Sequence, residues 1–357
     1  MGNSFGNIFR LTTFGESHGK MIGGVIDGCP PSVELDFNFI NEQLQKRRPG
    51  QSSITSQRNE LDDIDFVSGI FEGKTTGSPI AFIIKNRDYI EEDYSHKKDK
   101  FRPSHADFTY YKKYGNIDYR GGGRSSARET ANWVVAGSIA LQILKNNGIE
   151  IKAYVSSVGS ISLTKSYKDL DLSMIEKTIV RCPDLMIAKK MIKEIEKVRK
   201  EGDSIGGCIK CIASGVPPGL GDPVFNKLHS SLAKSMLSIN AVHGFKYGFE
   251  CIDISNSNGS IVNDIILDSS GKTRFNYSGG IQGGISNGND IYCEVFFKPV
   301  STIMKTQETI DKKGRKTLLE GKGRHDSCVV PRATPIVESM MALTLLDAYL
   351  INKINVI

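Results

Sequence analysis

The sequence predicts an α+β protein that is built from two related halves, each made of strands and helices around one shared core. The first observation behind this fold class is an internal repeat. Residues 15–31 and residues 202–218, offset by 187 positions, are identical at seven of seventeen positions without a gap. Each copy then continues through an aspartate, Asp36 or Asp222, into an amphipathic helical pattern.

A second, looser repeat supports the same division of the chain. A Gly-Arg pair at 123–124 and an Arg-x-Thr at 128–130 precede one apolar helical run. Gly-Arg at 323–324 and Arg-x-Thr at 332–334 precede another, at 336–351. We therefore expect one domain over residues 1–357, composed of halves at about 1–187 and 188–357.

The hydrophobic pattern and the turn residues predict the elements of each half in order. In the first half we expect a strand at 8–14, a turn at 15–19, a strand at 21–27, a helix at 37–45, strands near 66–71 and 80–84, and a helix that opens with a capping box at Ser126–Glu129 and stops at Gly148. In the second half we expect a helix at 185–200, a strand at 205–213, a helix at 224–237, a glycine loop at 279–288, a strand at 291–297 and a helix at 336–351.

Composition excludes several classes of protein. The chain has 357 residues, of which 39% are hydrophobic and 24% charged, as in ordinary soluble proteins. No apolar run approaches the roughly 20 residues that a membrane span needs, and no signal sequence opens the chain. We expect a cytoplasmic protein without a membrane partner. Its seven scattered cysteines are then expected to be reduced thiols.

The arginines indicate the kind of ligand. Lysine outnumbers arginine 31 to 15, yet eight of the arginines lie in or beside turns marked by glycine or proline. Arginine at such positions suits two-pronged binding of phosphate or carboxylate. A nucleic-acid partner would need a longer basic stripe with aromatic residues, which the sequence lacks. The expected ligand is an anionic small molecule.

Residues 101–130 carry the highest density of such groups. This stretch contains three consecutive glycines at 121–123 and a histidine and an aspartate at 105 and 107. A glycine loop that leads into a helix N-terminus presents backbone N–H groups to an anion. The loop is flanked by four arginines, Arg102, Arg120, Arg124 and Arg128.

One motif is also typical of a different class of enzyme, the serine hydrolases. Residues 15–19 read GESHG and match the G-x-S-x-G nucleophile elbow of α/β-hydrolases. An elbow requires a helix after the serine and several strands before it. Here a second strand follows, and only fourteen residues precede the motif, so a serine hydrolase is disfavoured. His18, in this cramped turn, is instead a candidate to face a ligand.

Taken together, the motifs resemble the chorismate synthase family along nearly the whole chain. They are GESHG at 15–19, RRPGQ at 47–51, FRPSHAD at 101–107, YRGGGRSSARET at 119–130, EGDSIG at 201–206, SINAVHG at 238–244, GGIQGGISNG at 279–288 and GRHD at 323–326. The resemblance implies a homotetramer and a layered sandwich with helices between antiparallel sheets. It also implies the 1,4-anti elimination of phosphate from 5-enolpyruvylshikimate 3-phosphate to give chorismate, the last common step of aromatic amino-acid biosynthesis, with reduced FMN as the electron donor.

The resemblance also implies roles for single residues. His18 would assist the departing phosphate, His105 would protonate or stabilise the reduced flavin, and Asp347 would help to accept the proton. Ser17 and Ser126 would relay hydrogen bonds. The implied substrate contacts are Arg47, Arg48 and Arg128, and the implied flavin contacts are Arg124, Ser125, Ser126, Asn240, Ala241, Gly283, Lys298, Pro299, Val300, Ser301, Thr302 and Arg324. No metal site is expected.

The helical pattern at 336–351 also predicts that the side chain of Asp347 faces the core. At 100° per residue it shares a stripe with Met340 and Leu343, whereas Glu338 lies on the opposite side and is expected to face solvent. A carboxylate that faces the core must be paired, protonated or open into a site. Pairing with Arg332 or with the backbone is the structural alternative to catalysis.

The sequence departs from the family pattern at three places. Ser53 stands where many members have arginine, Ser104 replaces a usual glycine, and residues 304–310 keep little of the usual motif. The sequence leaves open whether the chain reduces its own FMN with NADPH or depends on a separate reductase. Two rival classes remain: a different flavin enzyme on the same scaffold, and a non-catalytic binder of a phosphate ligand.

Overall fold

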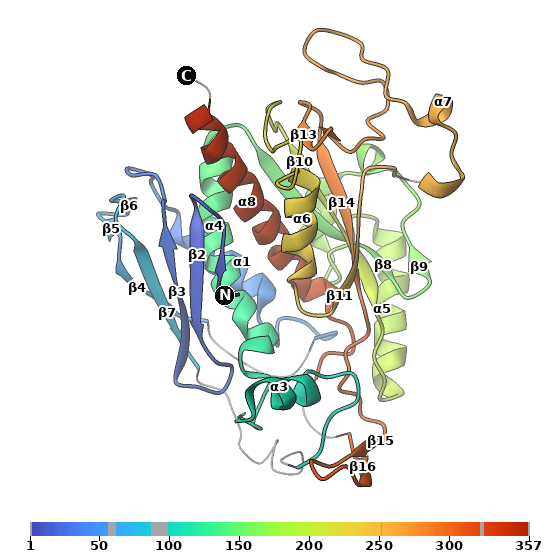
Figure 1. The fold of residues 1–357 in the computed structure, drawn as a ribbon. Helices are drawn as coiled ribbons and strands as arrows, with labels where there is room; N and C mark the ends of the chain where they lie inside the picture. Colours follow the sequence, from blue (N-terminus) through green and yellow to red (C-terminus); the bar gives the residue numbers. More distant parts are fainter. Residues whose placement is uncertain are drawn as a thin grey trace.

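Two five-stranded antiparallel sheets enclose a layer of helices (Figure 1). The computed structural model describes residues 2–55, 62–86, 99–116, 118–250, 252–321 and 325–355. One sheet is built from the N-terminal part of the chain, and the other lies on the far side of the helices. This arrangement confirms the expected α+β class.

The first sheet has the strand order β1-β2-β3-β7-β4. β2 and β3 form a hairpin in which Arg10 lies opposite Asp27 and Gly15 opposite Ile22. The turn of this hairpin carries Ser17 and His18, so the serine of the G-x-S-x-G motif is followed by a strand, not by a helix. The strands are β1 (Ser4–Phe5), β2 (Arg10–Gly15), β3 (Met21–Asp27), β4 (Ile64–Ser68) and β7 (Ile80–Lys85); a small separate pair is β5 (Ile70–Phe71) and β6 (Lys74–Thr75).

The second sheet has the order β11-β14-β10-β8-β9. Because β8 begins at residue 150 and pairs along its whole length with β10, the sheets divide the chain near residue 148. This differs from the boundary expected at about 187, which was set by the repeat alone. The strands are β8 (Glu150–Val158), β9 (Ile161–Ser162), β10 (Gly207–Ser214), β11 (Val242–Tyr247) and β14 (Ile291–Phe297).

The internal repeat is visible in the structure. β3 and β10, which carry the repeated sequence, are each the central strand of their sheet. Each is followed by a helix of the inner layer, α1 (Phe37–Arg47) or α6 (Leu228–Leu237). α6 begins four residues later than expected, because the preceding loop includes Phe225 in a left-handed conformation (φ 38°) that a helix cannot contain.

The helices α4 (Thr130–Asn146) and α8 (Val330–Asn355) cross in the middle of the protein. At the crossing, a Cβ atom on Gly137 would lie 2.2 Å from the Cβ atom of Ser339. Only a glycine allows so close an approach. Around this point, apolar side chains of both sheets and of the inner helices form one continuous hydrophobic core.

α8 differs from expectation in three ways. It begins six residues earlier and contains Pro335 in its interior. By length and composition alone, α8 is long and apolar enough to cross a membrane, although the sequence analysis found no apolar run of that length. α8 is apolar because it lies between the two sheets. Glu338 does not face solvent: its Oε1 accepts a hydrogen bond from the N–H of Ala153 on β8 (2.8 Å), and burial raises its pKa to about 7.

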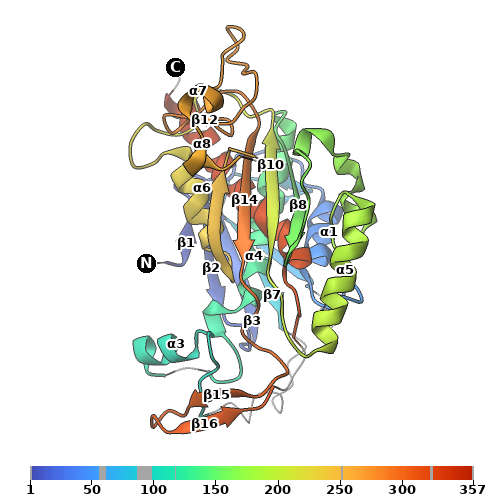
Figure 2. The same cartoon turned by 90° about the vertical axis from the view of Figure 1, so that its right-hand side faces the viewer.

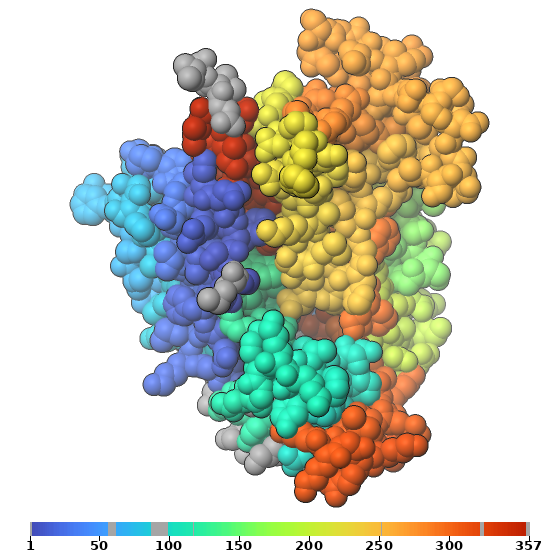
Figure 3. Space-filling view, viewed as in Figure 1, coloured from blue at the N-terminus to red at the C-terminus, as the bar shows by residue number. Residues whose placement is uncertain are grey.

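The remaining elements lie outside the two sheets and the helix layer. α5 (Leu185–Lys200), predicted with the correct bounds, covers the outer side of the second sheet (Figure 2). α3 (Asp107–Tyr114) and the hairpin of β15 (Gln307–Ile310) and β16 (Lys316–Leu319) lie side by side at the lower end of the molecule (Figures 1 and 3). The peptide groups of Phe101 and Ile310 join these two segments. The short hairpin of β12 (Ile281–Gln282) and β13 (Ile285–Ser286) lies at the opposite end, beside α7 (Gly259–Val262).

Candidate active site

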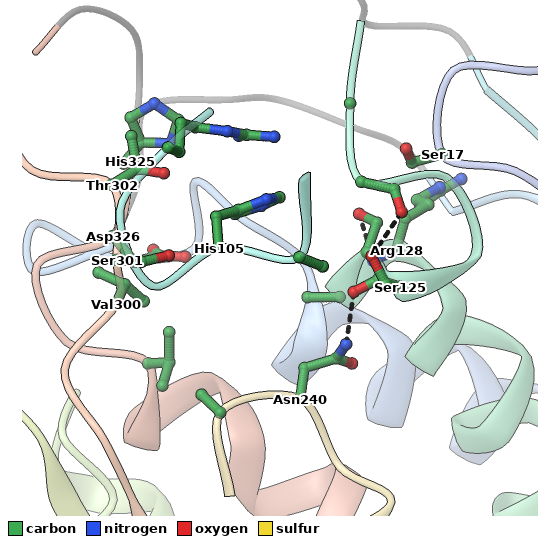
Figure 4. A pocket seen from close by; sticks show the side chains of 18 of the residues that line it. Ser17, His105, Ser125, Arg128, Asn240, Val300, Ser301, Thr302, His325 and Asp326 are labelled. Atoms are coloured by element: carbon green, nitrogen blue, oxygen red, sulfur yellow. Dashed lines mark hydrogen bonds between the residues drawn. The ribbon is translucent and has the colours of Figure 1, made fainter. Parts of the chain in front are cut away.

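A cavity of about 360 Å³ lies beside the C-terminus of α1 and the N-termini of α4 and α8 (Figure 4). Arg47 closes α1, Arg128 stands just before α4, and Arg332 lies in the first turn of α8. This volume is in the range of small-molecule sites. Its wall combines residues far apart in sequence: Ser17, His18, Arg47, Arg102, Ser104, His105, Gly121, Gly122, Ser125, Ser126, Arg128, Asn240, Ala241, Lys298, Val300, Ser301, Thr302, His325, Asp326 and Arg332.

Arg47 and Arg128 share one buried carboxylate, that of Asp62. Arg47 Nη1 lies 3.3 Å from Oδ2, and Arg128 Nη1 contacts Oδ1. Arg128 also donates from Nε to the side chain of Asn86 (2.9 Å). Burial alone would raise the pKa of Asp62, but the charges of Arg47 and Arg128 outweigh this effect and hold that pKa below its ordinary value. The two guanidinium groups are thus held side by side at the cavity wall.

The glycine loop turns beneath the cavity into two short 3₁₀ turns and then into α4. Ser126 caps the second turn, because its hydroxyl accepts a hydrogen bond from the N–H of Arg128 (3.3 Å). The expected capping box is only half formed, since the buried carboxylate of Glu129 accepts instead from Arg124 Nη1 (2.7 Å) and from the hydroxyl of Thr13. Burial raises the pKa of Glu129, although Thr13 and Arg124 oppose the rise. Glu129 therefore ties the loop to strand β2.

Ser17 and His18 reach the cavity from the β2–β3 turn. The Oγ atom of Ser17 lies 2.9 Å from Nδ1 of His18, and both side chains are buried. Gly121 packs directly against them: a Cβ atom there would lie 2.2 Å from His18 Nδ1 and 2.8 Å from Ser17 Oγ. The glycine loop and the turn thus fit together only because residue 121 has no side chain.

His105 projects into the cavity between the two walls (Figure 4). Its Nδ1 atom lies 2.7 Å from Oδ1 of Asp107, and the negative charge of this carboxylate favours a proton on the ring. Asp107 is in turn held by Arg102, which donates from Nε and Nη2 at 2.7 Å each. Burial would raise the pKa of Asp107, but the bonds from Arg102 and His105 dominate and lower it strongly.

The opposite wall contains four of the twelve residues expected to contact flavin. Val300, Ser301 and Thr302 line it together with Lys298, whose Nζ atom donates to the carbonyl of Ser104 (3.2 Å). Ser104 itself has a φ of 55°, the left-handed conformation that favours glycine. The family's usual glycine at this position is therefore explained by the backbone, and the serine is retained here at some cost in strain.

Several expected contacts lie elsewhere. Arg124 lines a neighbouring cavity of about 900 Å³ on the other side of the glycine loop. Arg48 and Pro299 do not line the central cavity, and Gly283 lies in the β12–β13 turn at the far end of the molecule. Ser53 is exposed, and its carbonyl accepts a hydrogen bond from Arg199. Arg324 lies outside the described residues.

Asp347 is not part of this cavity. Its Oδ1 atom accepts hydrogen bonds from the N–H groups of Ile8 (2.7 Å) and Phe9 (3.1 Å), and its Oδ2 atom accepts from the backbone and the side chain of Asn7 (2.9 Å each). The carboxylate faces inward, as the helical pattern indicated, and it is satisfied by three backbone N–H groups and the side chain of Asn7. This is the structural alternative that the sequence left open for Asp347: the carboxylate holds the segment before β2.

Replacing Asp347 by Asn should accordingly lower the free energy of unfolding by about 2 kcal/mol, since an amide cannot accept from four donors as a carboxylate does. Chemical unfolding measures this change, and turnover of the folded variant should stay within about twofold of wild type. Asp222→Asn is the matched control, because Asp222 is exposed and lines the same cavity, of about 480 Å³, as Asp347. A tenfold slower turnover with unchanged stability would restore the catalytic assignment.

His325 and Asp326 were missed as site residues. Both line the cavity, and Asp326 pairs with Nη1 of Arg332. Asp326 is the one carboxylate in the cavity wall within the part of the chain that the structure describes. The GRHD motif at 323–326 was visible in the sequence, but its histidine and aspartate follow no helical or strand pattern that would have indicated their direction.

Two antiparallel sheets, with buried arginines and histidines around one cavity, define an α+β enzyme that acts on an anionic small molecule. The family model for chorismate synthase matches residues 9–350. The chain therefore belongs to the chorismate synthase family.

Individual relatives agree with this family. The chain is 60% identical over 352 residues to "Chorismate synthase" of Christiangramia forsetii, covering 99% of this chain and 98% of the relative. It is 59% identical over 353 residues to "Chorismate synthase" of Azobacteroides pseudotrichonymphae, with coverage of 98% and 99%. A solved structure, "Crystal Structure of Chorismate Synthase", superimposes with a TM-score of 0.77 at 29% identity, covering 97% of this chain and 92% of the other.

Proposed function

We propose that the chain catalyses the 1,4-anti elimination of phosphate from 5-enolpyruvylshikimate 3-phosphate to give chorismate, as a carbon–oxygen lyase. In this reaction a ring carbon–oxygen bond breaks, phosphate leaves with the electron pair, a ring proton is lost, and a second ring double bond forms. The observation that carries the proposal is the pair of buried arginines, Arg47 and Arg128, beside Ser17 and His18 in one cavity. A substrate with one phosphate and two carboxylates suits two adjacent guanidinium groups, which bind such oxygens in pairs.

The far wall of the cavity fits FMN. The Oδ1 atom of Asn240 is buried without a hydrogen-bond partner, while its Nδ2 atom donates to the carbonyl of Ser125 (2.7 Å). An unpartnered buried acceptor in a ligand cavity suits an N–H donor of the flavin ring. Ala241 beside it has a φ of 67°, a strained conformation of the kind that clusters at ligand sites. Asn240, Ala241, Lys298 and residues 300–302 would hold the flavin, and reduced FMN supplies transient electron density to a reaction that is redox-neutral overall.

The chain's own residues divide the remaining tasks. Arg47 and Arg128 bind the anionic groups of the substrate. His18, held by Ser17, donates a proton to the departing phosphate oxygen. His105, oriented by Asp107, holds a proton towards the flavin side. Asp326 takes the place of Asp347 as the group that accepts the ring proton, because it lies in the cavity wall and Asp347 does not.

Further parts of the proposal concern assembly and the supply of electrons. We propose a homotetramer in the cytoplasm. Large apolar side chains on the surface support association between copies; Phe225 is 93% exposed, and Phe71 69%. FMN is reduced either by this chain with NADPH or by a separate flavin reductase. Such a reductase would then be a protein partner of the chain.

An anaerobic assay tests the activity directly. Protein, FMN reduced with dithionite, and 5-enolpyruvylshikimate 3-phosphate should give chorismate, followed by its absorbance, without net oxidation of the flavin. A phosphate-ligand binder would give no product, and an ordinary flavin oxidoreductase would leave the flavin oxidised. Replacing dithionite by NADPH separates the two sources of electrons, and mass photometry of the same preparation measures the assembly.

A further inference from the structure

Arg181 is a buried arginine outside the cavity wall, in the segment that joins the 3₁₀ turn at 172–177 to α5. Its φ of 57° is left-handed, a conformation that glycine adopts at far lower cost. The backbone fixes this conformation, because the N–H of Arg181 donates to the carbonyl of Thr178 (3.0 Å) and its own carbonyl accepts from the N–H of Val155 (2.9 Å). Because a left-handed backbone is costly for arginine, we expect the side chain of Arg181 to make interactions that offset this cost.

The guanidinium of Arg181 joins two helix ends. Nη1 donates to the carbonyl of Lys46 (3.1 Å) in the last turn of α1 and to the carbonyl of Pro331 in the first turn of α8. Nη2 donates to Oε1 of Gln51 (2.6 Å), and Gln51 Nε2 donates back to the carbonyl of Arg48 (2.9 Å). One side chain thus connects α1, the turn that follows it, and α8.

Both carbonyls lack a normal helical partner. The last carbonyls of α1, including that of Lys46, have no N–H further along the helix to bind. The carbonyl of Pro331 should accept from residue 335, but residue 335 is proline and has no N–H. Side-chain donors take these places: Gln51 Nε2 also contacts the carbonyl of Lys46, and the hydroxyl of Thr334 donates to the carbonyl of Pro331 (3.2 Å). Arg181 is the donor that the two carbonyls share.

Each of the two carbonyls belongs to the residue immediately before a cavity arginine. Lys46 precedes Arg47, and Pro331 precedes Arg332. The two arginine segments are joined directly as well, since Nε of Arg332 donates to the carbonyl of Arg47 (2.9 Å). Arg181 itself does not line the cavity, so its bridge supports the two arginine segments from outside the cavity wall.

We propose that Arg181 is a positioning residue that sets the spacing of Arg47 and Arg332, and through it the affinity for the anionic substrate. This inference depends on the proposed function, because it assumes that Arg47 binds the substrate. Lysine cannot replace Arg181, since a single ammonium lacks the planar fork that spans three acceptors on different segments. A displacement of the Arg47 segment weakens substrate binding, while the flavin wall at 240–241 and 298–302 is not touched by Arg181.

Arg181→Lys should raise KM for 5-enolpyruvylshikimate 3-phosphate about tenfold, with kcat within about twofold of wild type. Direct titration of the substrate by calorimetry should show the same loss, and the affinity for FMN should be unchanged. Arg315→Lys, an exposed arginine paired with Asp311 on the β15–β16 hairpin, is the matched control. If Arg181→Lys does not fold, Gln51→Ala, which removes one acceptor of the fork, should give a smaller rise in KM in the same direction.

Combination with Arg47→Ala separates positioning from a general structural role. Because Arg181 acts through Arg47, Arg181→Lys should reduce substrate affinity by less than twofold in the Arg47→Ala background. Equal losses in both backgrounds, or unchanged KM in Arg181→Lys and Gln51→Ala, would overturn the positioning role. Unchanged substrate affinity in Arg47→Ala itself would instead contradict the proposed substrate site.

Discussion

Gly121→Ala should lower turnover at least about 100-fold while the protein remains folded. The added methyl group would lie 2.2 Å from Nδ1 of His18 and 2.8 Å from Oγ of Ser17, distances at which one group must move. Relief of this overlap moves the His18 side chain or the glycine loop from its place at the cavity. A misplacement of about 1 Å in a reacting group can cost 10²-fold in rate, so turnover and not folding should show the effect.

Steady-state kinetics and FMN titration check this result. FMN affinity should change little, because His18 lies away from the flavin wall. Gly19→Ala is the matched control in the same turn: its methyl group would meet atoms of Glu16 at 3.5 Å and beyond, which are ordinary contacts. Near-normal turnover in Gly121→Ala would mean that neither His18 nor Ser17 needs its observed position for catalysis.

Asp62→Asn should lower the free energy of unfolding by about 3–5 kcal/mol in the absence of ligand. The change leaves Arg47 and Arg128 buried side by side without their shared counter-ion, and breaking a buried ion pair on one side costs an amount of this order. An anion in the cavity can replace the lost charge. Inorganic phosphate should therefore raise the melting temperature of the variant more than that of the wild type.

The same carboxylate predicts a pH dependence. The pKa of Asp62 is lowered in the folded protein, so its stabilising contribution is complete above the ordinary carboxyl pKa of about 4. That contribution is lost as the pH falls below this value towards the lower pKa of the folded state. Asp62→Asn should flatten this acid limb of the stability curve, whereas Asp65→Asn, at an exposed position on β4, should not. If the loss of stability at acid pH is the same in Asp62→Asn as in the wild type, Asp62 does not cause it.

Local signals were sufficient for much of the fold. The strands at 21–27 and 291–297 and the helix at 185–200 were predicted with their observed bounds, because each is a periodic run closed by clear turn residues. The repeated sequence also predicted β3 and β10, the central strands of the two sheets. The partition of the chain between the sheets was not predictable, since only the pairing of β8 with β10 assigns residues 150–158 to the second sheet.

The site was predictable where its residues lie in dense motifs. His18, His105 and Arg128 all line one cavity, and each belongs to one of the motifs that the sequence analysis singled out, GESHG, FRPSHAD or YRGGGRSSARET. Asp62 and Arg181 have no local signal, and their roles arise from partners on other elements. Asp347 shows the limit most clearly: the helical pattern gave its direction correctly, but the backbone amides that satisfy it are about 340 residues away in sequence.

The bond between Asp347 and the amides of Asn7, Ile8 and Phe9 also constrains the order of events during biosynthesis. The segment that leads into β2 is synthesised about 340 residues before the carboxylate that fixes it. The hairpin that carries His18 therefore lacks this anchor until α8 has been made. Until then the apolar face of the first sheet also lacks the helix that covers it, so a nascent chain of this kind needs protection from aggregation until α8 has left the ribosome.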